Sequence, residues 1–169
     1  MKQKNIYLIG PMAVGKSTVG KILASKLHRQ FYDTDQEIVR STGVEVSLIF
    51  ELEGEEGFRK RETEMIRELS ELENCIVATG GGAILKNENQ ALLRETGQIV
   101  YLCCSVQQQL YRTRFDTKRP LLKTENPRQK LEQLMQQRAP IYESLADITV
   151  STEKLNSKRV INKIIEQLG

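Results

Sequence analysis

The sequence predicts an α/β domain in which a parallel sheet of five strands is flanked by helices, and three observations predict it. Five short apolar runs recur along the chain, segments with a helical apolar period separate them, and a glycine-rich loop follows the first run. Near-continuous apolar strands that alternate with helices are typical of a parallel sheet covered on both faces. A chain of 169 residues without a linker or a repeat is expected to form a single domain, residues 1–169.

The first predicted strand, residues 5–9, leads into a loop, residues 10–18, that fits the pattern G-x-x-x-x-G-K-[ST]. A helical apolar period follows over residues 19–27, so the loop has the preceding strand and the following helix that a phosphate-binding loop needs. Its backbone N–H groups and the helix N-terminus favour phosphate. Lys16 adds a mobile positive charge, and the Ser17 hydroxyl can bind Mg²⁺. The pattern predicts a nucleotide phosphate site.

The later elements follow from the same periodicities. Four further strands are predicted at 30–35, 75–78, 99–104 and 148–150, and helices at 55–72, 89–95, 106–114, 127–145 and 158–168, with short helical patterns interrupted near Gly43 over 36–52. Binding sites in parallel α/β folds gather at the carboxyl ends of the strands. The polar groups that follow strands, at 10–18, 33–35 and 79–82, are therefore the candidate site residues.

Asp33 and Asp35 are two residues apart, so in an extended chain their side chains project to the same side. One can then orient Mg²⁺ and the other accept a proton, whereas a helix N-cap is the alternative interpretation. The glycines at 80–82 permit close approach of the backbone to a ligand, or simply form a tight turn. Arg59 and Glu62 have i, i+3 spacing, and an exposed pair of this kind contributes only ~0.2–0.5 kcal/mol. Alone, that pair indicates no function.

Residues 112–126 form a polar, basic segment that contains Arg112, Arg114, Lys118 and Arg119. Opposite a triphosphate such a segment can act as a lid, although runs of charge are more often solvated surface.

The composition excludes several classes of protein. No apolar run approaches the ~20 residues that span a bilayer, and no cleavage-site pattern follows the N-terminus, so we expect no membrane partner and a cytoplasmic location. A net charge of +3 without a long basic run does not indicate nucleic acid. Three cysteines without a C-x-x-C pattern indicate a reducing compartment, and a single histidine, His28, excludes a histidine-rich metal site.

In combination these features form a more specific pattern. The matching stretches are 10–18, 31–35, 57–62, 79–82, 118–122 and 138–142. In this order and spacing they resemble the shikimate kinases, and the resemblance covers nearly the whole chain. It implies a P-loop fold similar to that of nucleoside monophosphate kinases, with a substrate-binding insertion at about 33–62 and a lid at about 112–126.

The resemblance also implies the reaction. Shikimate kinases transfer the γ-phosphate of ATP to the 3-hydroxyl of shikimate, which gives shikimate 3-phosphate in aromatic amino acid (chorismate) biosynthesis. It implies shikimate and ATP as partners, one Mg²⁺ per subunit, and a monomer. The chemistry agrees, because a carboxylate is well matched by a guanidinium fork and vicinal hydroxyls need acceptors and backbone donors.

The same resemblance assigns the residues. ATP would be bound by Ala13, Val14, Gly15, Lys16, Ser17, Thr18, Arg112, Arg119 and Asn156, and shikimate by Asp35, Arg59, Gly80, Gly81, Gly82 and Arg138. Asp35, Lys16 and Arg119 would be catalytic. Ser17 would bind Mg²⁺ directly and Asp33 through water. Arg112 would stack on adenine, with the segment near 156–157 closing that pocket.

One position departs from the family pattern. Many relatives have glycine where this chain has Ala13, a position at which the backbone can need a positive φ.

The sequence also leaves other functions to be weighed. A kinase of another small polyol or nucleotide, such as gluconate, would share the phosphate loop and the lid. A phosphate-driven switch protein would need N-K-x-D and D-x-x-G motifs, which the sequence lacks. A non-catalytic nucleotide-binding module would leave the substrate-side residues unexplained.

Overall fold

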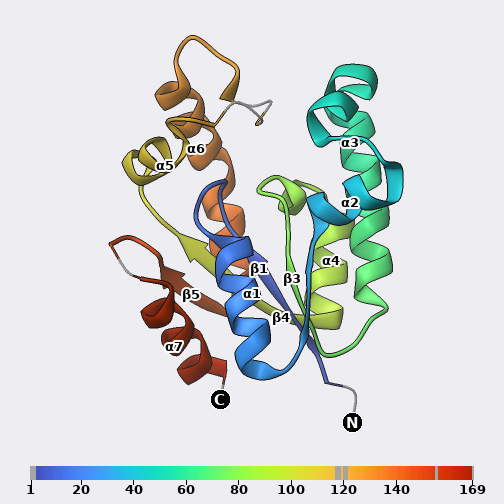
Figure 1. The fold of residues 1–169 in the computed structure, drawn as a ribbon, viewed down its shortest axis with the longest axis vertical. Helices are drawn as coiled ribbons and strands as arrows, with labels where there is room; N and C mark the ends of the chain where they lie inside the picture. Colours follow the sequence, from blue (N-terminus) through green and yellow to red (C-terminus); the bar gives the residue numbers. More distant parts are fainter. Residues whose placement is uncertain (1–2, 117–118, 120–121, 155, 169) are drawn as a thin grey trace.

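The computed structural model describes residues 3–116, 119, 122–154 and 156–168. Its centre is one parallel sheet in the strand order β2-β3-β1-β4-β5 (Figure 1). The strands are β1 (Asn5–Ile9), β2 (Gln30–Asp33), β3 (Cys75–Ala78), β4 (Gly97–Cys103) and β5 (Ile148–Ser151). The predicted fold class and the five strands are confirmed.

Seven α-helices and one short 3₁₀ helix occur in the described part of the chain. They are α1 (Lys16–Leu27), α2 (Thr34–Thr42), α3 (Val46–Ser70), η1 (Ala83–Leu85), α4 (Asn87–Thr96), α5 (Val106–Thr113), α6 (Pro127–Leu145) and α7 (Ser157–Leu168). Gly54, with φ 73° and ψ −179°, breaks α3 into two helical parts. The predicted helix at 55–72 is therefore the second of these parts.

One sequence-based prediction is wrong in its local structure. The strand expected at 30–35 ends at Asp33, and Asp35 lies in the first turn of α2. The reason is the N-cap: the Asp33 carboxylate accepts hydrogen bonds from the backbone N–H groups of Asp35 and Gln36, which begins a helix at Thr34. Asp33 and Asp35 are consequently not related by the two-residue repeat of a strand.

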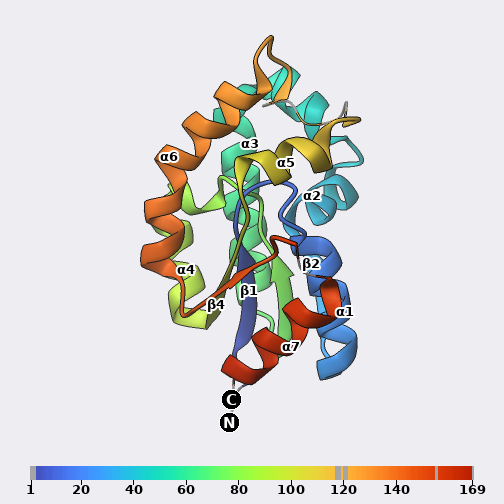
Figure 2. The same ribbon diagram turned by 90° about the vertical axis from the view of Figure 1, so that its left-hand side faces the viewer.

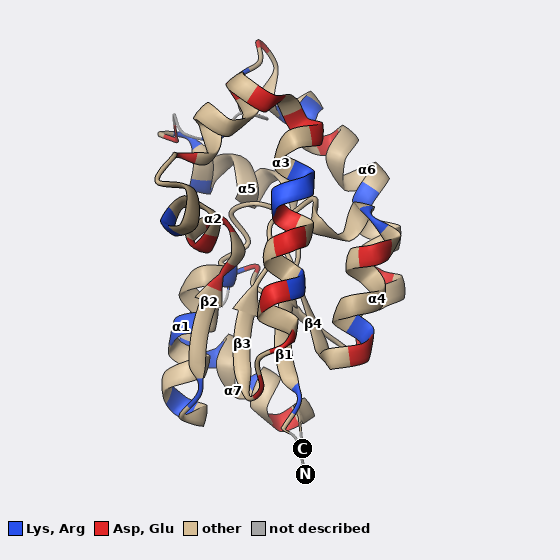
Figure 3. Ribbon diagram, turned by 90° about the vertical axis from the view of Figure 1, so that its right-hand side faces the viewer, with Lys and Arg blue, Asp and Glu red and all other residues tan. Residues whose placement is uncertain are grey.

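Helices cover both faces of the sheet, as strands that are apolar on both sides require (Figure 2). In β1, Ile6 and Leu8 face a core built with α1 and α7. Tyr7 and Ile9 face the opposite core, built with α3, α4 and α6. The outer face of α3 carries acidic and basic residues together (Figure 3), while its inner face buries Phe58 and Ile66.

The strand order places the candidate residues at one edge. β1 lies between β3 and β4, and the order of the strands changes direction there. Parallel α/β folds bind ligands at the carboxyl ends of the strands at such a switch point. The phosphate loop follows β1, residues 79–82 follow β3, and Asp33 ends β2 opposite Ala78. The first and the last residues that the structure describes lie at the other end of the sheet (Figures 1 and 2). None of the described helices combines the length and apolar composition needed to cross a bilayer.

Candidate active site

A cleft of about 760 Å³ opens at this edge of the sheet. It is lined by residues of the phosphate loop, of the β2–α2 junction, of the glycine turn after β3, and of α5 and the segment that follows it: Met12 to Val19, Asp33, Asp35, Gln36, Thr79, Gly80, Gly81, Arg112, Asp116, Arg119, Thr152, Ser157 and Val160. Segments from across the chain thus meet at one cleft. Arg59, Gly82, Arg138 and Asn156 are not among the lining residues.

The phosphate loop has the backbone conformation that its glycines allow. Gly10 has φ 145° and Gly15 φ 103°, and a side chain at Gly10 would clash with the Leu102 carbonyl. Ala13 has φ 63°, so this alanine lies in the left-handed region. The sequence indicated that the backbone can need a positive φ at this position, where many relatives have glycine. For a residue with a Cβ atom that conformation costs roughly 1–2 kcal/mol.

Lys16, at the first position of α1, folds back over the loop. Its Nζ donates to the carbonyl oxygens of Gly10 at 2.7 Å and Pro11 at 2.9 Å. Burial lowers the pKa of the ammonium group to about 8, and the positive charge of Arg119 acts in the same direction. These partners are neutral carbonyls, which an anionic phosphate can replace.

Ser17 and Asp33 bring a hydroxyl and a carboxylate together beside Lys16. The Ser17 hydroxyl donates to Asp33 Oδ2. The other Asp33 oxygen accepts from the N–H of Asp35 at 2.9 Å and of Gln36 at 3.2 Å. Asp33 is therefore an N-cap and at the same time offers an oxygen to the cleft, so the two interpretations of this residue do not exclude each other.

Asp35 points one unpaired oxygen into a buried environment. Its Oδ1 has no hydrogen-bond partner within the described residues. Burial raises the pKa of the carboxyl, and the nearby Asp33 acts in the same direction. The positive charges of Lys16, Arg59 and Arg119 oppose this shift.

Arg59 and Glu62 form a buried ion pair rather than a surface pair. Arg59 is 8% exposed and Glu62 is 0% exposed. Arg59 Nη1 lies 2.9 Å from Glu62 Oε1, and Nη2 lies 3.2 Å from Glu55 Oε1. Burial raises the pKa of Glu62 to about 7, against the opposing charge of Arg59. A guanidinium held in this way has a fixed orientation, which the spacing in sequence could not indicate.

The glycine turn lets these side chains close around the backbone. A Cβ atom at Gly80 would lie 2.6 Å from Glu62 Oε2, and one at Gly82 would clash with the Arg59 guanidinium. At Gly81 the Cβ would lie 3.4 Å from Arg138 Nη1. Arg138, on α6, is 5% exposed. The two arginines thus approach the same turn from α3 and α6.

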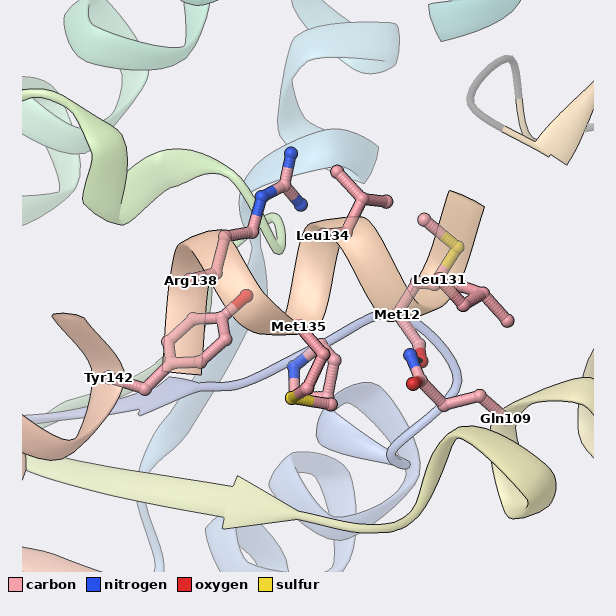
Figure 4. A pocket seen from close by; sticks show the side chains of 8 residues that line it. Met12, Gln109, Leu131, Leu134, Met135, Arg138 and Tyr142 are labelled. Carbon is pink, nitrogen blue, oxygen red and sulfur yellow. Dashed lines mark hydrogen bonds between the residues drawn. The ribbon is translucent and has the colours of Figure 1, made fainter. Parts of the chain in front are cut away.

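A second, much smaller cavity lies between the phosphate loop, α5 and α6 (Figure 4). Its volume of about 10 Å³ is close to that of one water, so it cannot hold a substrate. Met12, Gln109, Leu131, Leu134, Met135, Arg138 and Tyr142 contribute to its walls. Mostly apolar side chains of the phosphate loop and of α6 meet around this cavity.

The α5 side of the cleft is tied to the phosphate loop by side-chain donors. Arg112 Nη1 donates to the carbonyl oxygens of Ala13 at 3.0 Å and Val14 at 3.1 Å, and Nη2 to the carbonyl of Thr152 at 3.1 Å. The buried Gln109 donates to the Met12 carbonyl at 3.0 Å. Gln109 could not be predicted from the sequence, because a glutamine on an amphipathic helix is ordinarily exposed.

Arg119 and Asn156 have their own partners. Arg119 Nε lies 2.7 Å from Asp116 Oδ2. The Asn156 side-chain oxygen accepts from the N–H of Arg159 at 2.9 Å, and it therefore caps α7. Residues 117–118, 120–121 and 155, which belong to the expected lid and adenine segments, lie outside the described residues.

Comparison with known proteins gives consistent matches. The family model described as shikimate kinase matches residues 12–169. A shikimate kinase of Methylococcus capsulatus is 53% identical over 163 residues, which are 96% of this chain and 91% of the relative. The structure of a shikimate kinase from Acinetobacter baumannii in complex with shikimate matches with a TM-score of 0.96 and 46% identity, over 98% of this chain and 93% of that chain.

A gluconokinase from Sinorhizobium meliloti also matches, over 98% of this chain and 91% of that chain, with a TM-score of 0.60 and 16% identity. This likeness shows the fold alone.

Proposed function

The chain belongs to the shikimate kinase family, and we propose how its own residues carry out that family's reaction. The enzyme transfers the γ-phosphate of ATP to the 3-hydroxyl of shikimate and so acts in aromatic amino acid biosynthesis. One observation carries the assignment of residues: two buried arginines and a half-buried aspartate lie beside a glycine turn at the edge of the sheet where the phosphate loop opens.

Shikimate is bound by the acceptor half of the cleft. We define it as the lining residues Asp35, Gly80 and Gly81 together with Gly82 and the side chains that adjoin the turn, Arg59, Glu62 and Arg138. Arg59 and Arg138 bind the carboxylate, since guanidinium forks match carboxylates in geometry and charge. Glu62 orients Arg59 through the ion pair of 2.9 Å. The turn supplies backbone donors, and Asp35 accepts a hydrogen bond from the reacting hydroxyl.

Phosphoryl transfer takes place in the phosphate half, which we define as the loop 10–18 with Arg112 and Arg119. Negative charge spreads over the transferring group in the transition state, and Lys16 and Arg119 are the cations that meet it. To do so, Lys16 gives up its bonds to two carbonyls and Arg119 its contact with Asp116. Asp35, on the acceptor side, orients the attacking hydroxyl and accepts its proton.

Magnesium fits the pair Ser17 and Asp33. Mg²⁺ prefers oxygen ligands, keeps several waters and usually takes one or two carboxylates together with substrate phosphates. Ser17 Oγ and Asp33 Oδ2 are two such oxygens already in contact at the head of α1. We propose that Ser17 binds the ion directly and Asp33 through water. The bound ion neutralises charge on the phosphate oxygens.

The remaining assignments concern the rest of the nucleotide and the assembly. Arg112 and the segment at 156–157 form the adenine pocket, which Ser157 at the cleft and the contacts of Arg112 with Thr152 support. The region 33–62 carries the acceptor side and 112–126 acts as the lid. Both halves of the cleft come from one chain, which supports a monomer as the working unit, and the cytoplasm is the proposed location.

A coupled assay of ADP release tests the proposal. ADP should form rapidly with shikimate present and very slowly without it or with gluconate, and phosphorus NMR should identify the product as shikimate 3-phosphate. A site whose buried polar groups lose their partners can reject an analogue by ~10⁴ or more. Equal rates with shikimate and gluconate would contradict the proposal.

A further inference from the structure

Tyr142 connects α6 to the glycine turn. Its hydroxyl donates to the Gly81 carbonyl oxygen. The side chain is 1% exposed, and its ring stacks on Tyr101 of β4 with centroids 5.0 Å apart and planes 23° apart. Burial raises the pKa of the phenol, which keeps the hydroxyl protonated as a donor. A buried, stacked ring gives this donor a fixed position.

The turn that receives this hydrogen bond needs an anchor. Three consecutive glycines have more backbone freedom than any other tripeptide, and ordering them costs correspondingly more. The Gly80 N–H donates to Thr34 Oγ1 at 3.1 Å, and the Ala83 N–H donates to the Gly80 carbonyl at 3.1 Å. Within the described residues, the Tyr142 hydroxyl is the one donor to the Gly81 carbonyl.

Fixing that carbonyl also fixes a donor. The Gly81 C=O and the Gly82 N–H belong to one planar trans peptide and point in opposite directions. The Gly82 N–H donates to no acceptor within the described residues. When Tyr142 holds the carbonyl on its own side, the Gly82 N–H is turned away from Tyr142.

The same helix aims the guanidinium. Arg138 lies one helical turn before Tyr142, so the two side chains share a face of α6, and Figure 4 shows them side by side. Arg138 Nη1 lies 3.4 Å from the position of a Cβ atom on Gly81. Tyr142 therefore contacts Gly81 at its carbonyl, and Arg138 approaches the space in which a side chain at Gly81 would lie.

We propose that Tyr142 is a positioning residue for the acceptor: its hydroxyl fixes the Gly81–Gly82 peptide so that the backbone donors of the turn and the Arg138 guanidinium bind the same shikimate molecule. This inference rests on the proposed acceptor half. It assigns no contact with ATP to Tyr142.

Tyr142→Phe tests this, because it removes one oxygen and keeps the stacked ring. We expect the KM for shikimate to rise about 3- to 10-fold, the equivalent of one hydrogen bond, with the KM for ATP unchanged. Two control variants remove hydroxyls elsewhere: Tyr101→Phe from the partner ring, and Tyr7→Phe from a buried hydroxyl that contacts Thr96 at 2.6 Å. Both should keep the wild-type KM for shikimate.

A second measurement separates failure of this inference from failure of the proposed function. In nitrogen–proton NMR spectra of the ligand-free enzyme, the Gly81 and Gly82 amide signals should shift in Tyr142→Phe and not in Tyr101→Phe. Unshifted signals, an unchanged KM for shikimate, or an equal rise in both KM values would overturn the inference. If instead Arg138→Ala leaves shikimate binding intact while the amide signals move in Tyr142→Phe, the acceptor half is assigned wrongly.

Discussion

The acceptor half of the cleft holds its arginines inside the protein, whereas the phosphate half holds its cations on groups that a ligand can replace. Arg59 lies against the fully buried Glu62, and Arg138 is 5% exposed beside the glycine turn. Lys16, by contrast, donates to two loop carbonyls, and Arg119 contacts Asp116 across side chains that are 42% and 23% exposed. The acceptor half is ordered by the fold itself.

This difference separates the tasks of the two halves. Side chains that become ordered only on binding cost free energy and lower the affinity. A guanidinium that is already fixed in the free enzyme avoids this cost, so the site binds its ligand more tightly and more selectively. An exposed ion pair such as Arg119–Asp116 is worth only about 0–1 kcal/mol, so exchanging it for a phosphate contact costs little. We therefore expect selectivity for the acceptor to come from the buried half and the rate of transfer from the cations that move.

Removing the central cation should have the largest effect. Lys16→Ala should lower kcat by at least about 10³-fold, because a charge aimed at the transferring phosphoryl group is lost. Lys21→Ala, on an exposed part of the same helix, is the matched control and should keep wild-type kinetics. Steady-state rates and circular dichroism on the same samples measure this. Near wild-type turnover in Lys16→Ala would refute the assignment of the loop.

Substitution of the two aspartates should have different kinetic effects, because Asp35 acts on the acceptor and Asp33 on the metal ion. Asp35→Asn should lower kcat by at least about 10²-fold with ATP affinity little changed, since the side chain acts on the acceptor hydroxyl. Asp33→Asn should instead raise the Mg²⁺ concentration needed for activity. Titration of activity with Mg²⁺ on both variants gives the comparison. Rescue of Asp35→Asn by excess Mg²⁺, without rescue of Asp33→Asn, would mean that the roles are reversed.

A methyl group added to the glycine turn should weaken the binding of shikimate and leave the binding of ATP intact. Gly82 has φ −97°, so alanine fits its backbone, but the new Cβ would displace the Arg59 guanidinium. Gly82→Ala should weaken shikimate binding about tenfold, as expected for loss of one charged hydrogen bond, and leave ATP binding intact. Gly81→Ala, whose Cβ would meet Arg138 at 3.4 Å, should have a smaller effect. Calorimetric titration of both ligands decides, and equal losses for shikimate and ATP would argue against a separate acceptor half.

Glu62 should give the acceptor half its pH dependence. Burial raises its pKa to about 7, Arg59 and Arg138 oppose the shift, and Asp35 adds to it. Protonation below about pH 7 removes the charge that holds Arg59, so kcat/KM for shikimate should fall about tenfold per pH unit there. Glu62→Gln cannot ionise and should lose this acid limb, whereas the ionisation of ATP affects both proteins alike. Identical pH profiles would contradict this role of Glu62.

The raised pKa of Glu62 also predicts how the free energy of unfolding changes with pH. Between the ordinary value of 4.5 and about 7, the native state binds more protons than the unfolded chain. The contribution of Glu62 to the free energy of unfolding is therefore fully present below about pH 4.5 and is lost as the pH rises through 7. Denaturant unfolding of wild type and Glu62→Gln at about pH 5 and about pH 8 measures it, and a constant difference between the two proteins would speak against it.

The sequence predicted the local patterns better than the contacts between them. The phosphate loop and the strands were predictable, because glycine spacing and apolar runs are local signals. The start of α2 was not, since Asp33 and Asp35 fit a strand end as well as a helix N-cap. The burial of Arg59 and Glu62 could not be read from i, i+3 spacing, which exposed pairs share. The contacts of Gln109 with Met12 and of Tyr142 with Gly81 join distant segments and have no signature in the sequence.

The most direct test of two separate halves is a cross-titration of two variants. Arg59→Ala and Lys16→Ala are each titrated calorimetrically with shikimate alone and with ATP and Mg²⁺ alone. Arg59→Ala should lose shikimate affinity on the order of 10²-fold and keep ATP affinity, and Lys16→Ala should do the reverse. If either variant loses both ligands equally while its circular dichroism matches the wild type, the two halves are not independent and the account is contradicted.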